Sequence, residues 1–177
     1  MNLIKPRTLI VITIFLLFSF LSYSQQWQHK FGGNGFEQGN CIIQTNDGGY
    51  LSVGQTNSYG DQNMNMYVVK TDIYGKLDWQ QVISTNENEI AYAAVQNTAG
   101  DYYVGGYTDG QGAGGKDIFI SKLNSSGGII WSKTFGGPLD DICYAMTLTN
   151  SNDLIVTGST RLSGSGNDDI IMIKISP

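Results

Sequence analysis

The chain has 177 residues, with 10 basic and 15 acidic side chains and a formal net charge of −5. An acidic surface repels nucleic-acid phosphate, and the sequence has no basic run that would override this repulsion, so nucleic acid is excluded as a partner. The 23 glycines and only 3 prolines, together with 10 tyrosines, favour short strands joined by tight turns.

Residues 1–24 have the features of a secretory signal peptide. Lys5 and Arg7 precede an apolar run over 9–21, and small residues stand just before Gln25. A membrane anchor is the rival interpretation, but the run is shorter than the roughly 20 residues that cross a bilayer. We therefore expect cleavage before Gln25, no membrane span afterwards, and a protein that is secreted or held on the outer surface of a Gram-negative bacterium.

Residues 25–177 form one domain in which a single motif returns three times at a spacing of 52 residues. The copies span 27–78, 79–130 and 131–177, and each opens with a tryptophan. Other positions also recur without a gap: Gly54, Gly106 and Gly158, then Lys70, Lys122 and Lys174. A fixed period of this length is typical of repeat architectures.

Each copy holds four strand-like runs. In the middle copy they lie at 92–96, 102–108, 118–123 and 129–135, with clusters of Gly, Asn, Asp and Ser between them. No segment keeps an apolar period of 3.6 residues, which argues against helices. Since propeller blades occupy about 40 to 50 residues, the predicted fold is all-β, with three four-stranded antiparallel propeller-type blades. A β-prism lectin fold is the structural competitor.

Four motifs also carry a family resemblance. The Trp-Ser-Lys-Thr-Phe-Gly-Gly motif of 131–137, together with 46–56, 117–123 and 127–131, resembles the repeats of secreted bacterial β-propellers, often called seven-bladed β-propeller-type repeats. The resemblance covers 27–175 and implies an architecture rather than a reaction. Similar proteins usually carry more repeats, so two alternatives stay open: a complete gene product, or a fragment of a longer propeller.

The recurring apolar and glycine residues have structural interpretations. The tryptophans Trp27, Trp79 and Trp131 are expected on the outermost strands, where they fill the widening gap between blades. The recurring glycines lie in the middle of strands, where glycine is otherwise unfavourable, and we expect them to mark close backbone approach between sheets.

The recurring lysines lie inside apolar strands, so each ammonium group needs a carboxylate nearby. Two recurring sets are candidate partners: Glu37, Glu89 and Asp141, and Asn65, Asp117 and Asp169. A repeated link between lysine and carboxylate is one interpretation. The other is a ring of acids lining a binding mouth, which makes Glu37, Glu89 and Asp141 the candidate site residues.

The sequence offers little for catalysis. The only histidine is His29, at a position where the other copies have Gln81 and Lys133, and a nucleophilic triad would need it. The Asp- and Asn-rich turns lack the alternating spacing of a calcium loop. We expect no enzyme, no cofactor and no metal. Cys41 and Cys143 fall on the same face of equivalent strands, so two buried free thiols are expected instead of a disulfide.

The expected function is that of a non-catalytic protein-interaction or structural module outside the cell, with an extracellular protein or glycan as partner. A lectin-like carbohydrate-binding protein is the alternative. The repeat phase makes 27–31 the fourth strand of a missing blade and leaves the last blade one strand short. If the chain is not a fragment, we expect a homodimer that completes a six-bladed ring.

Overall fold

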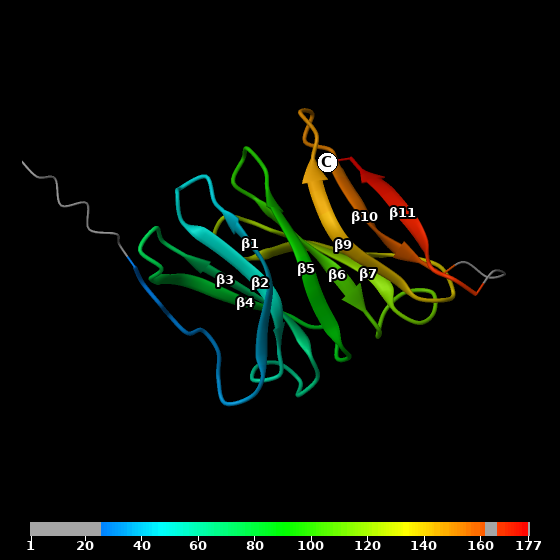
Figure 1. The fold of residues 1–177 in the computed structure, drawn as a ribbon, viewed down its shortest axis with the longest axis horizontal. Coiled ribbons are helices and arrows are strands. Elements are labelled where there is room, and N and C mark those ends of the chain that lie inside the picture. The colour runs from blue at the N-terminus through cyan, green and yellow to red at the C-terminus, as the bar shows by residue number, and fades with distance from the viewer. Residues whose placement is uncertain (1–25, 162–165, 177) are drawn as a thin grey trace, which may run out of the picture.

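The computed structural model describes residues 26–161 and 166–176, so the predicted signal peptide at 1–24 lies outside the described residues. The described chain folds into eleven strands (Figure 1). In order they are β1 (Glu37–Gln44), β2 (Tyr50–Thr56), β3 (Asn65–Thr71), β4 (Leu77–Ile83), β5 (Glu89–Gln96), β6 (Tyr102–Thr108), β7 (Asp117–Leu123), β8 (Ile129–Phe135), β9 (Asp141–Leu148), β10 (Leu154–Thr160) and β11 (Asp169–Ile175). No helix occurs among the described residues, and so none there could act as a transmembrane span.

The strands form three antiparallel sheets. Sheet 1 has the order β1-β2-β3-β4, sheet 2 the order β5-β6-β7-β8, and sheet 3 the order β9-β10-β11. The all-β prediction is confirmed, and the bounds of β6 and β8 agree with the runs predicted from the sequence. Sheet 3 has three described strands, one fewer than the other two sheets.

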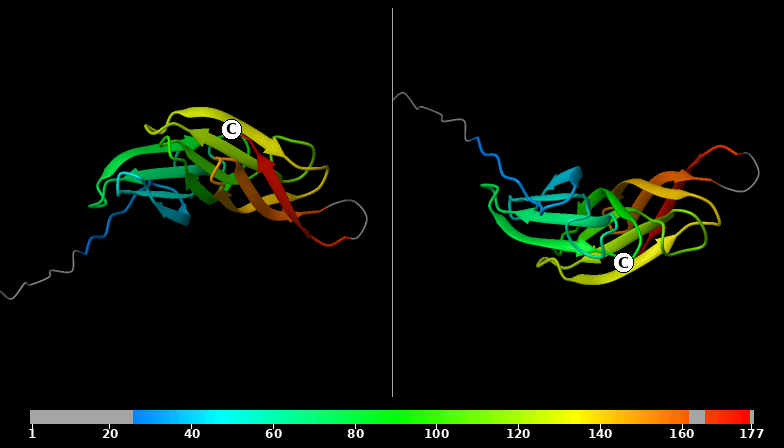
Figure 2. Two further views of the ribbon diagram at one scale, coloured as in Figure 1. Left: turned by 90° about the horizontal axis from the view of Figure 1, so that it is seen from above. Right: turned by 90° about the horizontal axis from the view of Figure 1, so that it is seen from below.

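The sheets are stacked face to face along the long axis of the molecule, with sheet 2 in the middle (Figures 1 and 2). Sheet 2 contacts sheet 1 mainly through β5, and sheet 3 contacts sheet 2 mainly through β9. One hydrophobic cluster fills each junction, around Val68 and Val104 between sheets 1 and 2, and around Ile120 and Val156 between sheets 2 and 3. The three sheets do not close into a ring.

Trp79 shows how the tryptophans join the sheets. It extends from β4 of sheet 1 onto sheet 2, where its indole lies 5.7 Å from the Tyr102 ring and its Nε1 donates to the Ser125 carbonyl at 3.2 Å. The predicted wedge between neighbouring sheets is confirmed for this residue. Residues 27–31 are not a strand in the described chain, where no strand lies beside them for pairing, so their expected pairing with a second copy stays a prediction.

The recurring glycines do mark a close backbone approach, but within a sheet and not between sheets. A β-bulge in the first strand of each sheet presses a carbonyl group onto the glycine of the second strand. A Cβ on Gly106 would overlap the carbonyl oxygen of Ile90 and lie 2.9 Å from the Cα of Ala91. Gly54 and Gly158 face Gln38 and Ile142 in the same way.

Both cysteines are free thiols, as expected. Cys143 is completely buried in the cluster between sheets 2 and 3, and burial raises the pKa of its thiol to about 12. Cys41 is only partly buried and packs against the cluster between sheets 1 and 2, so the prediction of full burial holds for Cys143 alone.

Candidate functional site

The three candidate acids each begin the first strand of a sheet, directly after the loop from the preceding segment. Glu89, at the start of β5, is fully buried. Its carboxylate accepts hydrogen bonds from the Thr85 backbone N–H at 3.1 Å, from the Thr85 hydroxyl, and from the Thr108 hydroxyl at 3.0 Å. Burial raises the pKa of Glu89 even though these bonds favour the ionised form. This acid fastens the loop between sheets 1 and 2.

Glu37 and Asp141 make related contacts with their own loops. Glu37 accepts from the Thr56 hydroxyl at 2.9 Å, and a hydrogen bond from Ser58 is the main cause that lowers the pKa of Glu37. Asp141 is 1% exposed, and its Oδ2 accepts from the Gly137 N–H at 2.7 Å. The three acids therefore share a loop-holding role at one end of the sheets. Their additional role as a binding mouth stays a prediction.

Asp141 has a buried acidic neighbour across the junction of sheets 2 and 3. Asp117, at the start of β7, is also 1% exposed, and atoms of both carboxylates lie beside Gly136. The Oδ1 of Asp141 is buried without a hydrogen-bond partner among the described residues. Asp141 therefore combines a buried acidic neighbour with an unpaired oxygen, an arrangement that costs free energy in the folded state.

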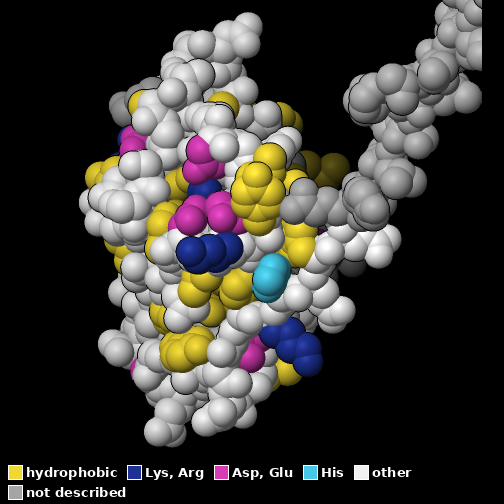
Figure 3. Space-filling model, turned by 90° about the vertical axis from the view of Figure 1, so that its left-hand side faces the viewer, with side chains coloured by type: hydrophobic (Ala, Val, Ile, Leu, Met, Phe, Trp, Pro, Cys, Tyr) yellow, Lys and Arg dark blue, Asp and Glu magenta, His cyan; other side chains and the backbone are white. Residues whose placement is uncertain are grey.

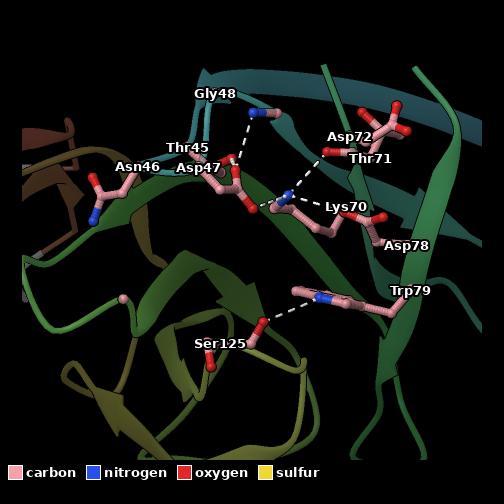
Figure 4. A network of polar contacts seen from close by, with 12 residues as sticks. Thr45, Asn46, Asp47, Gly48, Lys70, Thr71, Asp72, Asp78, Trp79 and Ser125 are labelled. Carbon is pink, nitrogen blue, oxygen red and sulfur yellow. Dashed lines mark hydrogen bonds and ion pairs between the residues drawn. The ribbon is translucent and has the colours of Figure 1, made fainter. Parts of the chain in front are cut away.

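The recurring lysines pair with a different set of carboxylates, at the opposite end of the sheets. Lys70 Nζ lies 2.8 Å from Asp47 Oδ2 and 3.2 Å from Asp78 Oδ2 (Figure 4). The equivalent pairs are Lys122 with Asp101 at 3.0 Å, and Lys174 with Asp153 at 2.8 Å. A repeated lysine-to-carboxylate link is confirmed, but both predicted partner sets were wrong, since those residues begin strands at the far end.

The first repeat makes this link with an acid that is displaced by two residues. Asp101 and Asp153 align with Gly49, where a Cβ would overlap the Thr71 carbonyl oxygen and lie 2.8 Å from Lys70 Nζ. A side chain at position 49 has no room, so Asp47 reaches the ammonium from the turn instead. Because the acid of the first repeat does not align with Asp101 and Asp153, the 52-residue period does not predict it.

In sheet 1 one ammonium group, that of Lys70, faces two carboxylates, those of Asp47 and Asp78. Hydrogen bonding to the Lys70 ammonium is the main cause that lowers the pKa of Asp47 to about 2. Burial acts to lower the pKa of Lys70, but the hydrogen bonds to Asp47 and Asp78 outweigh it and the pKa is raised. The same lysine donates to the Thr71 carbonyl at 2.9 Å, which connects the β1–β2 turn to β3 and β4. The contacts of Lys70 therefore hold the turn against the two strands.

A tyrosine cluster for which the sequence made no prediction lies on strands of sheets 2 and 3. Tyr92 is the bulged residue of β5, and its ring lies 5.6 Å from Tyr144, the bulged residue of β9. Tyr107 lies 6.2 Å from Tyr92, and the Lys116 ammonium sits 4.5 Å above the Tyr107 ring. Tyr144 is 51% exposed. We call Tyr92, Tyr107, Tyr144 and Lys116 the tyrosine patch.

The sequence signal for this patch was present but ambiguous. Its two bulged tyrosines align with each other and with Asn40, whose side-chain amide donates to the Ala91 carbonyl of sheet 2 at 2.9 Å. Tyrosines in strands are usual core residues, and only the bulge takes these two out of the regular alternation of side chains along the strand. Burial raises the pKa of both Tyr92 and Tyr107.

The remaining sequence candidates do not join a reactive constellation. His29 is exposed and lies beside Trp27 and Phe31, with ring centroids 5.6 Å and 6.3 Å away. Within 26–161 and 166–176, no group of three or more His, Cys, Asp or Glu side chains is placed to hold a metal ion. A comparison with known protein families and with curated proteins finds no match for the chain.

Proposed function

We propose that the chain is a secreted or cell-surface β-propeller-type repeat protein that acts as a non-catalytic interaction module for an extracellular protein. The observation that carries the proposal is the tyrosine patch, because it combines the exposed ring of Tyr144 and its tyrosine neighbours on the strands with a cation in the loop before β7. Tyrosine supplies a large contact area at low entropic cost and is enriched in binding surfaces. The recurring charged residues support this assignment, since they are engaged in holding loops and turns.

The propeller-type arrangement is supported by the placement of the strands. First strands of successive sheets converge, while the tryptophan of a fourth strand fills the space between sheets at their outer side. This is how radial blades pack around an axis. In such an arrangement the tyrosine patch faces the axis, together with Asn40.

The test is a binding measurement on the chain from Gln25 to Pro177 against surface proteins of the producing bacterium. Tyr144→Ala is expected to weaken binding at least about 10-fold, which is typical of removing a central aromatic contact. Tyr74→Ala is the matched control, since Tyr74 is 60% exposed but lies on the turn between β3 and β4. Equal affinity of the two variants would contradict the patch as the binding surface.

A lectin-like function is the second candidate, and the same exposed ring favours it. Tyr144 offers a flat apolar face on which a sugar ring can stack, with the Tyr92 and Tyr107 phenols and Lys116 nearby as donors. A glycan array distinguishes the candidates. Saturable binding to one sugar class that Tyr144→Ala abolishes would support the lectin, and a protein ligand without glycan binding would support the interaction module.

A further inference from the structure

We propose that two copies of this chain close into a six-sheet ring, in which residues 27–31 of each copy add a fourth strand to β11 of the other. This inference rests on the propeller-type arrangement proposed above and does not depend on the ligand. The surfaces that would meet in the ring are the outer faces of sheets 1 and 3, which lie at opposite ends of the stack.

Sheet 3 exposes residues that its sister sheets bury. Ile170 is 85% exposed, whereas Met66 and Ile118 at the same repeat position are 0% exposed. Met172 is 72% exposed, whereas its counterparts Val68 and Ile120 are 0% exposed. In sheets 1 and 2 these positions are covered by the next sheet of the stack. The outer face of sheet 3 is thus a junction face whose covering sheet is absent from the described chain.

The surface that fits this face is present at the other end of the same molecule. The outer face of sheet 1 carries the repeat positions that in sheets 2 and 3 contact the preceding sheet. Hydrophobic side chains lie among charged ones at this end of the molecule (Figure 3). Ile42 is 62% exposed there, while Ala94 at the same repeat position is 5% exposed. A hollow on this face is lined by Trp27, Phe31, Ile42, Tyr50, Ser52 and Val69, among others.

The edge of β11 also lacks a partner among the described strands. Its counterparts β3 and β7 are paired on both sides, with β4 and β8 as outer strands. An open edge with an apolar face is a template for strand addition. The register follows from the 52-residue period, since Val68 pairs with Gln81 and Ile120 with Lys133. The equivalent pair is Met172 with His29.

The N-terminal segment already has the position that this pairing requires. The Trp27 ring lies 5.9 Å from Tyr50 and covers Gly75, as the Trp79 ring lies 5.7 Å from Tyr102 and covers Gly127. Trp79 makes its contacts from the fourth strand of the preceding sheet. Trp27 therefore packs on sheet 1 in the way that the tryptophan of a preceding sheet would. Residues 27–31 lack only a neighbouring strand with which to pair.

A second copy can supply the missing strand and the covering sheet, whereas the two ends of one copy cannot meet. Sheet 2 separates sheets 1 and 3, and three sheets would have to turn about 120° each to meet, whereas propellers have 4 to 8 blades. Two copies give six sheets and two identical new junctions. Each junction face measures roughly 350 Å² by strand spacing and length, so four faces contribute about 1,400 Å², which lies in the range of stable interfaces.

The first experiment measures mass in solution for the chain from Gln25 to Pro177 by light scattering at micromolar concentrations. The expected result is a discrete dimer. Met172→Asp should raise the dimer dissociation constant at least about 100-fold, because it places an unpaired charge in the junction, and it should leave the circular dichroism spectrum unchanged. Ile130→Asp is the control and should stay dimeric: Ile130 is 50% exposed on β8, and sheet 1 has Asp78 at this repeat position.

The second experiment tests the register. In a Cys41→Ser background, His29→Cys with Met172→Cys should give a covalent dimer on oxidation, because opposite residues on paired strands have Cβ atoms about 5 Å apart. Gln28→Cys with Met172→Cys is the control, whose thiols lie on opposite faces and should not cross-link. A monomer, a dimer that Met172→Asp leaves intact, or a ladder of larger cross-linked species would overturn the closed ring. A monomer that still binds its ligand would leave the proposed function standing.

Discussion

Gly106 shows how a single atom decides whether a bulged pair of strands can form. The bulge at Tyr92 moves the Ile90 carbonyl toward β6, and only a residue without Cβ leaves room for it. We expect Gly106→Ala to lower the free energy of unfolding by about 1–3 kcal/mol, the usual cost of overpacking. Thermal or urea unfolding of the purified protein measures this.

Gly137→Ala is the matched control for this prediction. Its Cβ would meet nothing nearer than Asp141 Oδ2 at 3.9 Å, and the residue keeps its N–H for the same carboxylate. Its free energy of unfolding should stay within about 0.5 kcal/mol of that of the wild type. If both alanine variants lose the same stability, the close approach is not the cause.

Asp141 and Glu89 occupy one repeat position but should respond in opposite ways to amide substitution. Asp141→Asn keeps an oxygen for the Gly137 N–H and removes one of two buried charges, so it should raise the free energy of unfolding by about 1 kcal/mol at neutral pH. Glu89→Gln should lower it by about 1–2 kcal/mol, because the amide has one acceptor oxygen, whereas both oxygens of the carboxylate accept hydrogen bonds from Thr85 and Thr108. Parallel urea titrations compare the two. A loss of stability in Asp141→Asn would mean that its unpaired oxygen has a partner in solution.

At the scale of elements, the β1–β2 turn at 45–49 depends on an ionised Asp47. The pKa of this carboxyl is about 2 in the folded chain against 3.8 ordinarily, so its contribution to stability is present above pH 3.8 and is lost as the pH falls toward 2. Asp47→Asn should therefore show a smaller loss of stability between pH 4 and 2 than the wild type. Urea unfolding at a series of pH values measures this. Equal slopes in this window would show that Asp47 does not carry the effect.

This turn also shows where prediction from the sequence succeeds and where it stops. The 52-residue period and the alternation of strand runs predicted the all-β fold and the bounds of β6 and β8. The partner of Lys70 was missed because Gly49 has no room for a side chain, and the acid moved to position 47. The contact of position 49 with the Thr71 carbonyl prevents an acid from standing there, and a backbone contact of this kind leaves no periodic signal in the sequence.

The N-terminal segment illustrates the same limit for a whole element. Its sequence matches the fourth strands β4 and β8, but a strand forms only where a neighbouring strand supplies hydrogen bonds. The tyrosine patch was missed for a related reason, since the bulge that takes Tyr92 and Tyr144 out of the regular alternation depends on the pairing of two strands. Local sequence patterns predict where strands can form. The pairing between strands decides which of these segments becomes a strand and which side chains it exposes.

At the scale of the molecule, sheet 2 is the only described sheet with both faces covered, and it carries the two hydrophobic clusters. Stability in such a stack is the sum of each sheet and its contacts with its neighbours. Ile120→Ala should therefore cost about 2–5 kcal/mol, because it opens a cavity in the junction of sheets 2 and 3. Leu139→Ala, at a residue that is 38% exposed, should cost less than 1 kcal/mol in the same unfolding assay.

For the secreted protein proposed above, the placement of the two cysteines has a consequence for folding. Cys41 and Cys143 pack into different clusters on the two sides of sheet 2, so the native fold keeps their thiols apart. In the unfolded chain both thiols are free to meet, and an oxidising compartment favours their disulfide. That bond would link sheet 1 to sheet 3 and prevent sheet 2 from entering between them. Folding must then outpace oxidation, and refolding in oxidised glutathione should give a lower native yield than refolding in a reductant, a difference that Cys41→Ser should abolish.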